Sequence, residues 1–139
     1  MKKRIILVIA MLITSLSLSS CIITSRDINI DISCDQFSKN PHAMSEFQAE
    51  VGDNIREKLC SNPSTGFEWE YEMSGDNALK EEDYDFEEPK SDVPGAAGIE
   101  VWTFEAIENG VTEVRMEYNQ PWEGGDKEEW TYTMTVTVQ

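Results

Sequence analysis

The sequence predicts an all-β fold, an antiparallel β-sandwich of seven to eight strands. From Ile28 onward, apolar and polar residues alternate with a period of two, and almost no segment shows the 3.6-residue period of an amphipathic helix. Turn residues such as Gly52-Asp53 and Asn109-Gly110 separate the alternating segments. The sequence shows no internal repeat and no sign of a second domain, so residues 28–139 are expected to form one domain.

The strands follow in chain order from this alternation. The clearest one alternates Phe67, Trp69 and Tyr71 with glutamates, which indicates one buried and one solvated face. The acid-rich segment 74–91 is interpreted as a long connection with one edge strand through Tyr84 and Phe86. The expected strands are at residues 28–32, 47–51, 55–59, 67–73, 84–86, 99–106, 111–119 and 130–138.

The N-terminus has the pattern of an export signal. Lys2, Lys3 and Arg4 precede an apolar run at residues 5–12, which is too short to span a bilayer. Residues 18–21 resemble the bacterial lipoprotein box, which implies a lipoprotein signal peptide at 1–20, a lipid on Cys21 and a short tether at 21–27. The expectation is an exported cell-envelope lipoprotein anchored to the membrane by that lipid. A plain signal peptide and simple secretion are the alternative.

Export from the cytoplasm changes what is expected of the two remaining cysteines. Cys34 and Cys60 form an even pair in an oxidising compartment, which favours a disulfide over two buried thiols. These cysteines and the single histidine, His42, lack the close spacing of a metal site, so no metal or other cofactor is expected.

The charge excludes one class of partner. Lys and Arg number 11 against 27 Asp and Glu, a net charge of −16 that becomes −19 if the leader and its three basic residues are removed. Such a chain repels phosphate backbones and anionic membrane surfaces, so nucleic-acid binding is not expected.

Three windows depart from this acidic composition: residues 61–67, 93–99 and 118–122 hold turn residues and no ionisable carboxylate or base. Each lies between two expected strands, and Trp122 stands in a proline-containing turn where it would expose apolar area. One such window is an ordinary turn. Three at one end of a sandwich would form a neutral ridge of the kind used for partner recognition.

The motifs in these windows resemble those of the chagasin-like inhibitors of papain-type cysteine peptidases. Asn62-Pro63-Ser64-Thr65-Gly66-Phe67 followed by Trp69 is similar to the signature loop of that family. Gly95-Ala96-Ala97-Gly98 is similar to its glycine-rich second loop, and Gln120-Pro121-Trp122 to its third. The resemblance covers residues 47–138.

The resemblance implies a non-catalytic, immunoglobulin-like sandwich that inhibits reversibly and tightly, as a monomer, by closing three loops over the peptidase cleft. The thirteen residues of these motifs would bind the peptidase, with Ser64 and Thr65 nearest its thiolate and Trp122 on an aromatic surface. Pro63 and Gly66 bias the backbone to turn, away from the extended form of a substrate. Three residues depart from the family pattern: Ser64 replaces Thr, Gln120 replaces Arg, and Ala97 replaces a glycine, with strain of ~1 kcal/mol if that position needs positive φ.

Other classes of function are weighed against this one. A surface sandwich could bind carbohydrate through Trp102, Trp122 or Trp130. Calcium capture by Asp83, Asp85, Glu87 and Glu88 lacks the spacing of a calcium loop. An enzyme is the least supported reading, because His42 has no adjacent nucleophile pattern and Glu68, Glu70 and Glu72 suit a solvated strand face.

Overall fold

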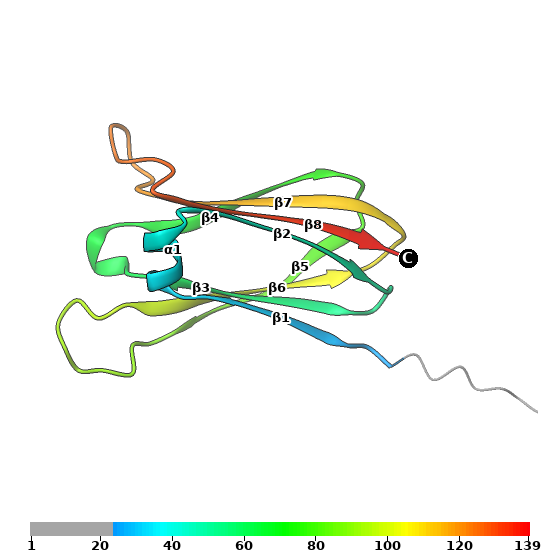
Figure 1. Cartoon of the computed structure of the whole chain (residues 1–139), viewed down its shortest axis with the longest axis horizontal. Coiled ribbons are helices and arrows are strands. Elements are labelled where there is room, and N and C mark those ends of the chain that lie inside the picture. The colour runs from blue at the N-terminus through cyan, green and yellow to red at the C-terminus, as the bar shows by residue number, and fades with distance from the viewer. Residues whose placement is uncertain (1–23) are drawn as a thin grey trace, which may run out of the picture.

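The structure is a computed structural model that describes residues 24–139, and within them eight strands form two packed four-stranded sheets (Figure 1). The predicted all-β sandwich is confirmed. The expected leader at 1–20, the lipidation site Cys21 and the start of the tether lie outside the described residues. One sheet has the order β1-β3-β6-β5 and the other β2-β8-β7-β4. The strands are β1 (Asp27–Ile32), β2 (His42–Ala49), β3 (Asn54–Ser61), β4 (Glu68–Gly75), β5 (Leu79–Glu87), β6 (Gly98–Ala106), β7 (Gly110–Asn119) and β8 (Trp130–Val138).

Strand direction differs from the expectation at two places. Four strand pairs are antiparallel as predicted, but β1 pairs with β3 in parallel and β2 pairs with β8 in parallel. The cause is that β2 lies in the opposite sheet. The chain leaves β1, returns along β2 in the other layer and then enters β3 in the first layer, so β1 and β3 run the same way.

A short helix, α1 (Cys34–Lys39), makes the crossing from β1 to β2 and was not expected. It begins with a capping box in which the Ser33 hydroxyl accepts from the Gln36 N–H (3.3 Å) and the Gln36 side chain accepts from the Ser33 N–H (2.8 Å). Phe37 is its buried residue. The helix is joined to β3 by the disulfide between Cys34 and Cys60, the pair favoured by the sequence.

Strand β5 is longer than the expected edge strand through Tyr84 and Phe86. It begins at Leu79 and pairs with β6 along its length, with an irregularity between Glu81 and Asp83. The first part of this strand was not predicted, because its residues are mostly acidic and show no alternation of apolar and polar side chains. β2 likewise begins five residues before the predicted 47, and Val51 lies in a turn after it.

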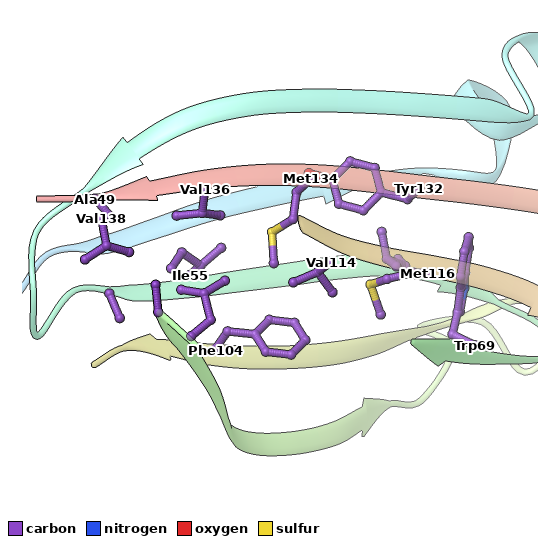
Figure 2. Packing of buried hydrophobic residues seen from close by; sticks show 14 of the residues in the cluster. Ala49, Ile55, Trp69, Phe104, Val114, Met116, Tyr132, Met134, Val136 and Val138 are labelled. Atoms are coloured by element: carbon purple, nitrogen blue, oxygen red, sulfur yellow. The ribbon is translucent and has the colours of Figure 1, made fainter. Parts of the chain in front are cut away.

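The core lies between the sheets and is filled by inward-facing side chains of both layers (Figure 2). Ile55 and Phe104 come from one sheet, and Val114, Met134 and Val136 from the other, all fully buried. No helix among residues 24–139 is long and apolar enough to cross a membrane.

Candidate functional site

Three connections meet at one end of the sandwich, opposite the end where the chain enters β1 and where β8 finishes (Figure 1). They are the β3–β4 loop (residues 62–67), the β5–β6 loop (88–97) and the β7–β8 loop (120–129). The β3–β4 loop joins the two sheets, while each of the others joins strands within one sheet. The three windows without ionisable side chains therefore lie at the same end, which is the arrangement that a recognition ridge requires.

The β3–β4 loop is a compact turn. Pro63–Thr65 form a 3₁₀ turn that ends at Gly66, whose φ of 78° is left-handed. Its backbone is closed by hydrogen bonds from the Thr65 N–H to the Asn62 carbonyl and from the Gly66 N–H to the Pro63 carbonyl, both 3.0 Å. The Thr65 hydroxyl donates to the Asn62 carbonyl, and the Ser64 hydroxyl to the Asn62 side-chain oxygen, both at 2.6 Å. Proline at the first position and glycine at the left-handed one fix this shape.

Side-chain amides connect this turn to the other two loops. Asn62 donates its Nδ2 to the carbonyl of Gly95 at 3.0 Å, and Gln120 donates its Nε2 to the carbonyl of Thr65 at 3.2 Å. The indole of Trp122 lies against Gly66, where a Cβ atom would overlap its six-membered ring. The three loops are thus one hydrogen-bonded and packed unit.

The β7–β8 loop is held by its own contacts. Gln120 and Asp126 exchange two hydrogen bonds, 2.8 and 3.1 Å, and the Gly125 N–H donates to the Trp122 carbonyl at 3.1 Å. The Lys127 ammonium donates to the carbonyl of Gln120. Trp122, at the tip, keeps 50% of its surface exposed, so it is available to a partner.

The β5–β6 loop contains Gly95 and Ala97 and ends just before Gly98. Gly95 has a φ of 80° and open space around its Cα, whereas Ala97 is not in the left-handed region. The strain considered for Ala97 is therefore absent. Gly98 is already the buried first residue of β6, where the ring of Phe86 leaves no room for a side chain. Val93 is 66% exposed in this loop.

A layer of aromatic rings lies beneath the loops. Phe37 of α1 lies 5.1 Å from both Trp69 and Trp130, measured between ring centroids, and Tyr118 contacts Trp69, Trp130 and Phe67 at 4.9–5.2 Å. The Tyr118 hydroxyl accepts from the Asn62 N–H at 2.7 Å. This packing, together with the disulfide at Cys60, fixes the end of β3 from which the β3–β4 loop emerges.

A buried carboxyl group lies behind the β3–β4 loop. Glu100 is 3% exposed and accepts from the Ser61 hydroxyl (2.6 Å), the Trp69 N–H (3.4 Å) and the Tyr84 hydroxyl (3.4 Å). Burial raises the pKa of Glu100, and its hydrogen bonds from Ser61 and Trp69 oppose that rise. Glu100 and Trp122 are both among the residues that line a groove of about 380 Å³.

The predicted site residues divide by exposure. Exposed residues are Pro63, Ser64, Thr65, Gly95, Ala97, Pro121 and Trp122; partly buried residues are Asn62, Gly66, Phe67, Ala96 and Gln120; Gly98 is buried. Phe67 and Gly98 shape the loops from within. Three further residues hold the loops: Tyr118, Gly125 and Lys127. Tyr118 lies in the third charge-free window but was not among the predicted binding residues, and Gly125 and Lys127 were not predicted, because contacts with loop backbone have no local sequence signal.

The other candidate sites are not assembled. Trp102 packs on Tyr71 and Tyr84, and Trp130 on Phe37 and Tyr118, so of the three tryptophans considered for carbohydrate Trp122 alone is well exposed. No group of three metal-ligating side chains occurs among residues 24–139. His42 forms a hydrogen bond with Thr131 at 3.0 Å on β2.

Comparison with known proteins gives a family match. The model of the chagasin family peptidase inhibitors I42 matches residues 48–136. Amoebiasin-2 of Entamoeba histolytica is 28% identical over 88 residues, which span 63% of this chain and 72% of that protein.

Solved structures share the fold. The cysteine protease inhibitor EhICP2 from Entamoeba histolytica superposes with a TM-score of 0.65 at 23% identity, covering 83% of this chain and 97% of that one. PbICP-C, solved in complex with falcipain-2, superposes with a TM-score of 0.55 at 15% identity, covering 83% of this chain and all of that one (100%). The expected immunoglobulin-like sandwich is therefore confirmed.

Proposed function

The chain belongs to the chagasin family of peptidase inhibitors, and on that premise we propose that it is a reversible, tight-binding inhibitor of papain-type cysteine peptidases. The observation that carries the proposal is the ridge formed by the three loops. They lie at one end of a stiff scaffold and are joined by the hydrogen bonds of Asn62 and Gln120 and by the contact of Trp122 with Gly66. A ridge ordered before binding loses little conformational entropy on entering a cleft.

The shape of the β3–β4 loop supports entry into the active site without cleavage. A substrate lies extended, so that its carbonyl meets both the nucleophile and the oxyanion donors. Residues 63–65 instead form a 3₁₀ turn, and the carbonyls of Asn62, Pro63 and Thr65 already accept hydrogen bonds within the protein. The loop therefore fills the site while withholding a reactive carbonyl in line with the thiolate.

The exposed residues have distinct parts in this proposal. Ser64 and Thr65 project from the turn and lie nearest the peptidase thiolate. The β5–β6 loop contacts one wall of the cleft through Gly95 and Ala97, and the β7–β8 loop contacts the other through Trp122. An interface of this kind buries about 800 Å² per partner, with Trp122 as an apolar anchor.

The proposal extends to where the domain acts. The sequence favours a lipid on Cys21, and β1 begins at the end of the sandwich opposite the loops (Figure 1). A membrane anchor at that end would direct the ridge away from the bilayer, so the anchored protein could still bind and inhibit a peptidase.

An inhibition assay tests the proposal. The purified protein is titrated against papain and a papain-type cathepsin, with a serine peptidase such as trypsin as control. We expect reversible, competitive inhibition of the cysteine peptidases, an intact protein on the gel after prolonged incubation, and unchanged trypsin activity. Absence of inhibition of any papain-type peptidase at micromolar protein would refute it.

A further inference from the structure

A groove of about 380 Å³ lies beside the ridge, between the β3–β4 loop, the β7–β8 loop and strand β5. Aromatic rings form much of its wall, from Phe67, Tyr84, Phe86 and Trp122, and two carboxylates, Glu68 and Glu100, line it as well. Trp122 is both the exposed tip of the ridge and part of this wall. Anything in the groove would therefore contact a partner bound to the loops.

The two carboxylates lie close to each other and to Tyr84. The Tyr84 hydroxyl donates to Glu100 at 3.4 Å, and Glu68 lines the same groove. Burial is the main cause that raises the pKa of Tyr84 and of Glu100; the charges of Glu100 and Glu68 add to the rise for Tyr84, and the charge of Glu68 adds to the rise for Glu100. Within residues 24–139, Lys and Arg form their ion pairs elsewhere, with Glu50, Asp53, Glu82, Glu87, Glu117 and Glu128. The nearby ammonium of Lys127 donates to the backbone carbonyls of Gln120 and Trp122, and no ion pair of Glu68 or Glu100 occurs within residues 24–139. The groove thus keeps an excess of negative charge.

We propose that this groove receives an arginine side chain from the rim of the partner peptidase. A guanidinium group is planar, so it can stack on the rings of Tyr84 and Trp122 while its N–H groups reach the oxygens of Glu68 and Glu100. A lysine ammonium matches the charge but has no flat face for the rings, and an apolar side chain offers neither carboxylate a donor. This inference rests on the proposed function for the identity of the partner, but the chemistry of the groove stands by itself.

A titration with a single amino-acid probe tests the groove without a peptidase. The protein is titrated with N-acetyl-arginine amide, and with N-acetyl-citrulline amide as a neutral probe of the same shape, while NMR follows the indole N–H of Trp122. We expect saturable shifts with the arginine probe in the millimolar range and at least tenfold weaker binding of the citrulline probe. Equal binding of the two probes, or no binding of either, would overturn the proposal.

A pair of variants locates the probe. Glu68→Gln removes a carboxylate from the groove, and Glu72→Gln makes the same charge change four residues along the same strand, outside it. Both side chains are exposed, so neither change should disturb folding. We expect Glu68→Gln to weaken the arginine probe at least threefold and Glu72→Gln to leave it unchanged; an equal effect of both would show long-range charge attraction only and refute the site.

The peptidase assay separates this inference from the proposed function. If the unmodified protein inhibits no papain-type peptidase, the proposed function fails, and the probe titration still decides the groove. If it inhibits, a peptidase with an arginine facing the groove should be inhibited several-fold less well by Glu68→Gln than by Glu72→Gln. The arginine contact would be refuted if the two variants inhibited that peptidase equally well and if changing the peptidase arginine to glutamine left its affinity for the unmodified protein unchanged.

Discussion

The indole ring of Trp122 lies directly over Gly66, although the two residues are 56 positions apart and belong to different loops. A Cβ atom on residue 66 would overlap Cη2 of the ring and lie 3.0 Å from Cζ3. Gly66 also has a φ of 78°, which a side chain disfavours. One glycine therefore ends the β3–β4 turn and makes room for the aromatic residue beside it.

Gly66→Ala is expected to weaken inhibition at least tenfold, because it adds backbone strain of ~1 kcal/mol and displaces the Trp122 ring. Gly124→Ala is the matched control, since Gly124 has a similar φ of 79°, open space around it and no assigned contact with the partner. Urea unfolding and inhibition constants measure the two effects. Equal losses of inhibition in both variants would show that strain alone matters and that the contact with Trp122 does not.

Trp122→Ala is expected to weaken inhibition by ~2 kcal/mol or more, roughly thirtyfold, as loss of a buried interface anchor. Because Trp122 is 50% exposed in the free protein, the free energy of unfolding should change by less than about 1 kcal/mol. Val93→Ala removes another exposed apolar side chain at the same end and serves as the comparison. A change in inhibition of only a few tenths of a kcal/mol would remove Trp122 from the site.

Asn62→Asp tests whether the connection between loops matters. The substitution keeps an oxygen to accept from the Ser64 hydroxyl but removes the amide that donates to the Gly95 carbonyl. We expect faster amide hydrogen exchange in the β5–β6 loop and a several-fold weaker inhibition, with little change at the aromatic layer. Unchanged exchange would mean that the β5–β6 loop is ordered without Asn62.

Replacing both Cys34 and Cys60 by alanine is expected to lower the free energy of unfolding by ~2–4 kcal/mol, since the disulfide closes a loop with a sequence separation of 26. Because this loop contains α1, Phe37 should lose its contacts with Trp69 and Trp130 early in unfolding. Urea titration with tryptophan fluorescence measures both effects. The same shift on adding a reductant to the unchanged protein would confirm the bond as the cause; no shift would exclude it.

Glu57 should make stability depend on pH in the neutral range. It is fully buried, neither carboxyl oxygen has a hydrogen-bond partner, and burial raises its pKa from 4.5 to about 8. The folded protein holds this proton while the unfolded chain releases it, so the free energy of unfolding should fall as pH rises from about 5 to 8, by up to ~1.4 kcal/mol per pH unit.

Glu57→Gln should remove that slope. The low pKa of Asp53, about 2 because of its hydrogen bonds from Arg26, acts only in acid. The pKa of Glu100, raised by burial, acts in the same direction in both proteins, so the difference between their slopes belongs to Glu57. Unfolding titrations at pH 5, 6, 7 and 8 compare the two proteins. Parallel curves for both would show that Glu57 is not the titrating group.

The shape of the candidate site was partly predictable because some of its signals are local. Asn62, Pro63 and Gly66 determine their own turn, and the charge-free windows, of which residues 118–122 end at Trp122, stand out in an acidic chain. The hydrogen bond from Gln120 to Thr65 was not predictable, since it joins residues 55 positions apart and depends on how the two sheets pack. The sequence thus indicated which three loops make up the candidate site, and the structure supplies how these loops are held together.

The errors in the fold have equally specific causes. Helix α1 is only six residues long, too short for a helical period, and its one signal was the capping box of Ser33 and Gln36. The parallel pairing of β1 with β3 depends on β2 lying in the other sheet, which alternation does not encode. Glu57 occupies an inward position that alternation predicts to be apolar, so its burial is visible only in three dimensions.

The parallel pairing has one further consequence. Because β1 runs beside β3 and β2 beside β8, the chain enters the domain, and leaves β8, at the end farthest from the ridge. A fusion partner or a chip surface attached there would stand about 30 Å away, the length of a nine-residue strand. Immobilisation through either terminus should therefore leave the protein able to capture a peptidase from solution.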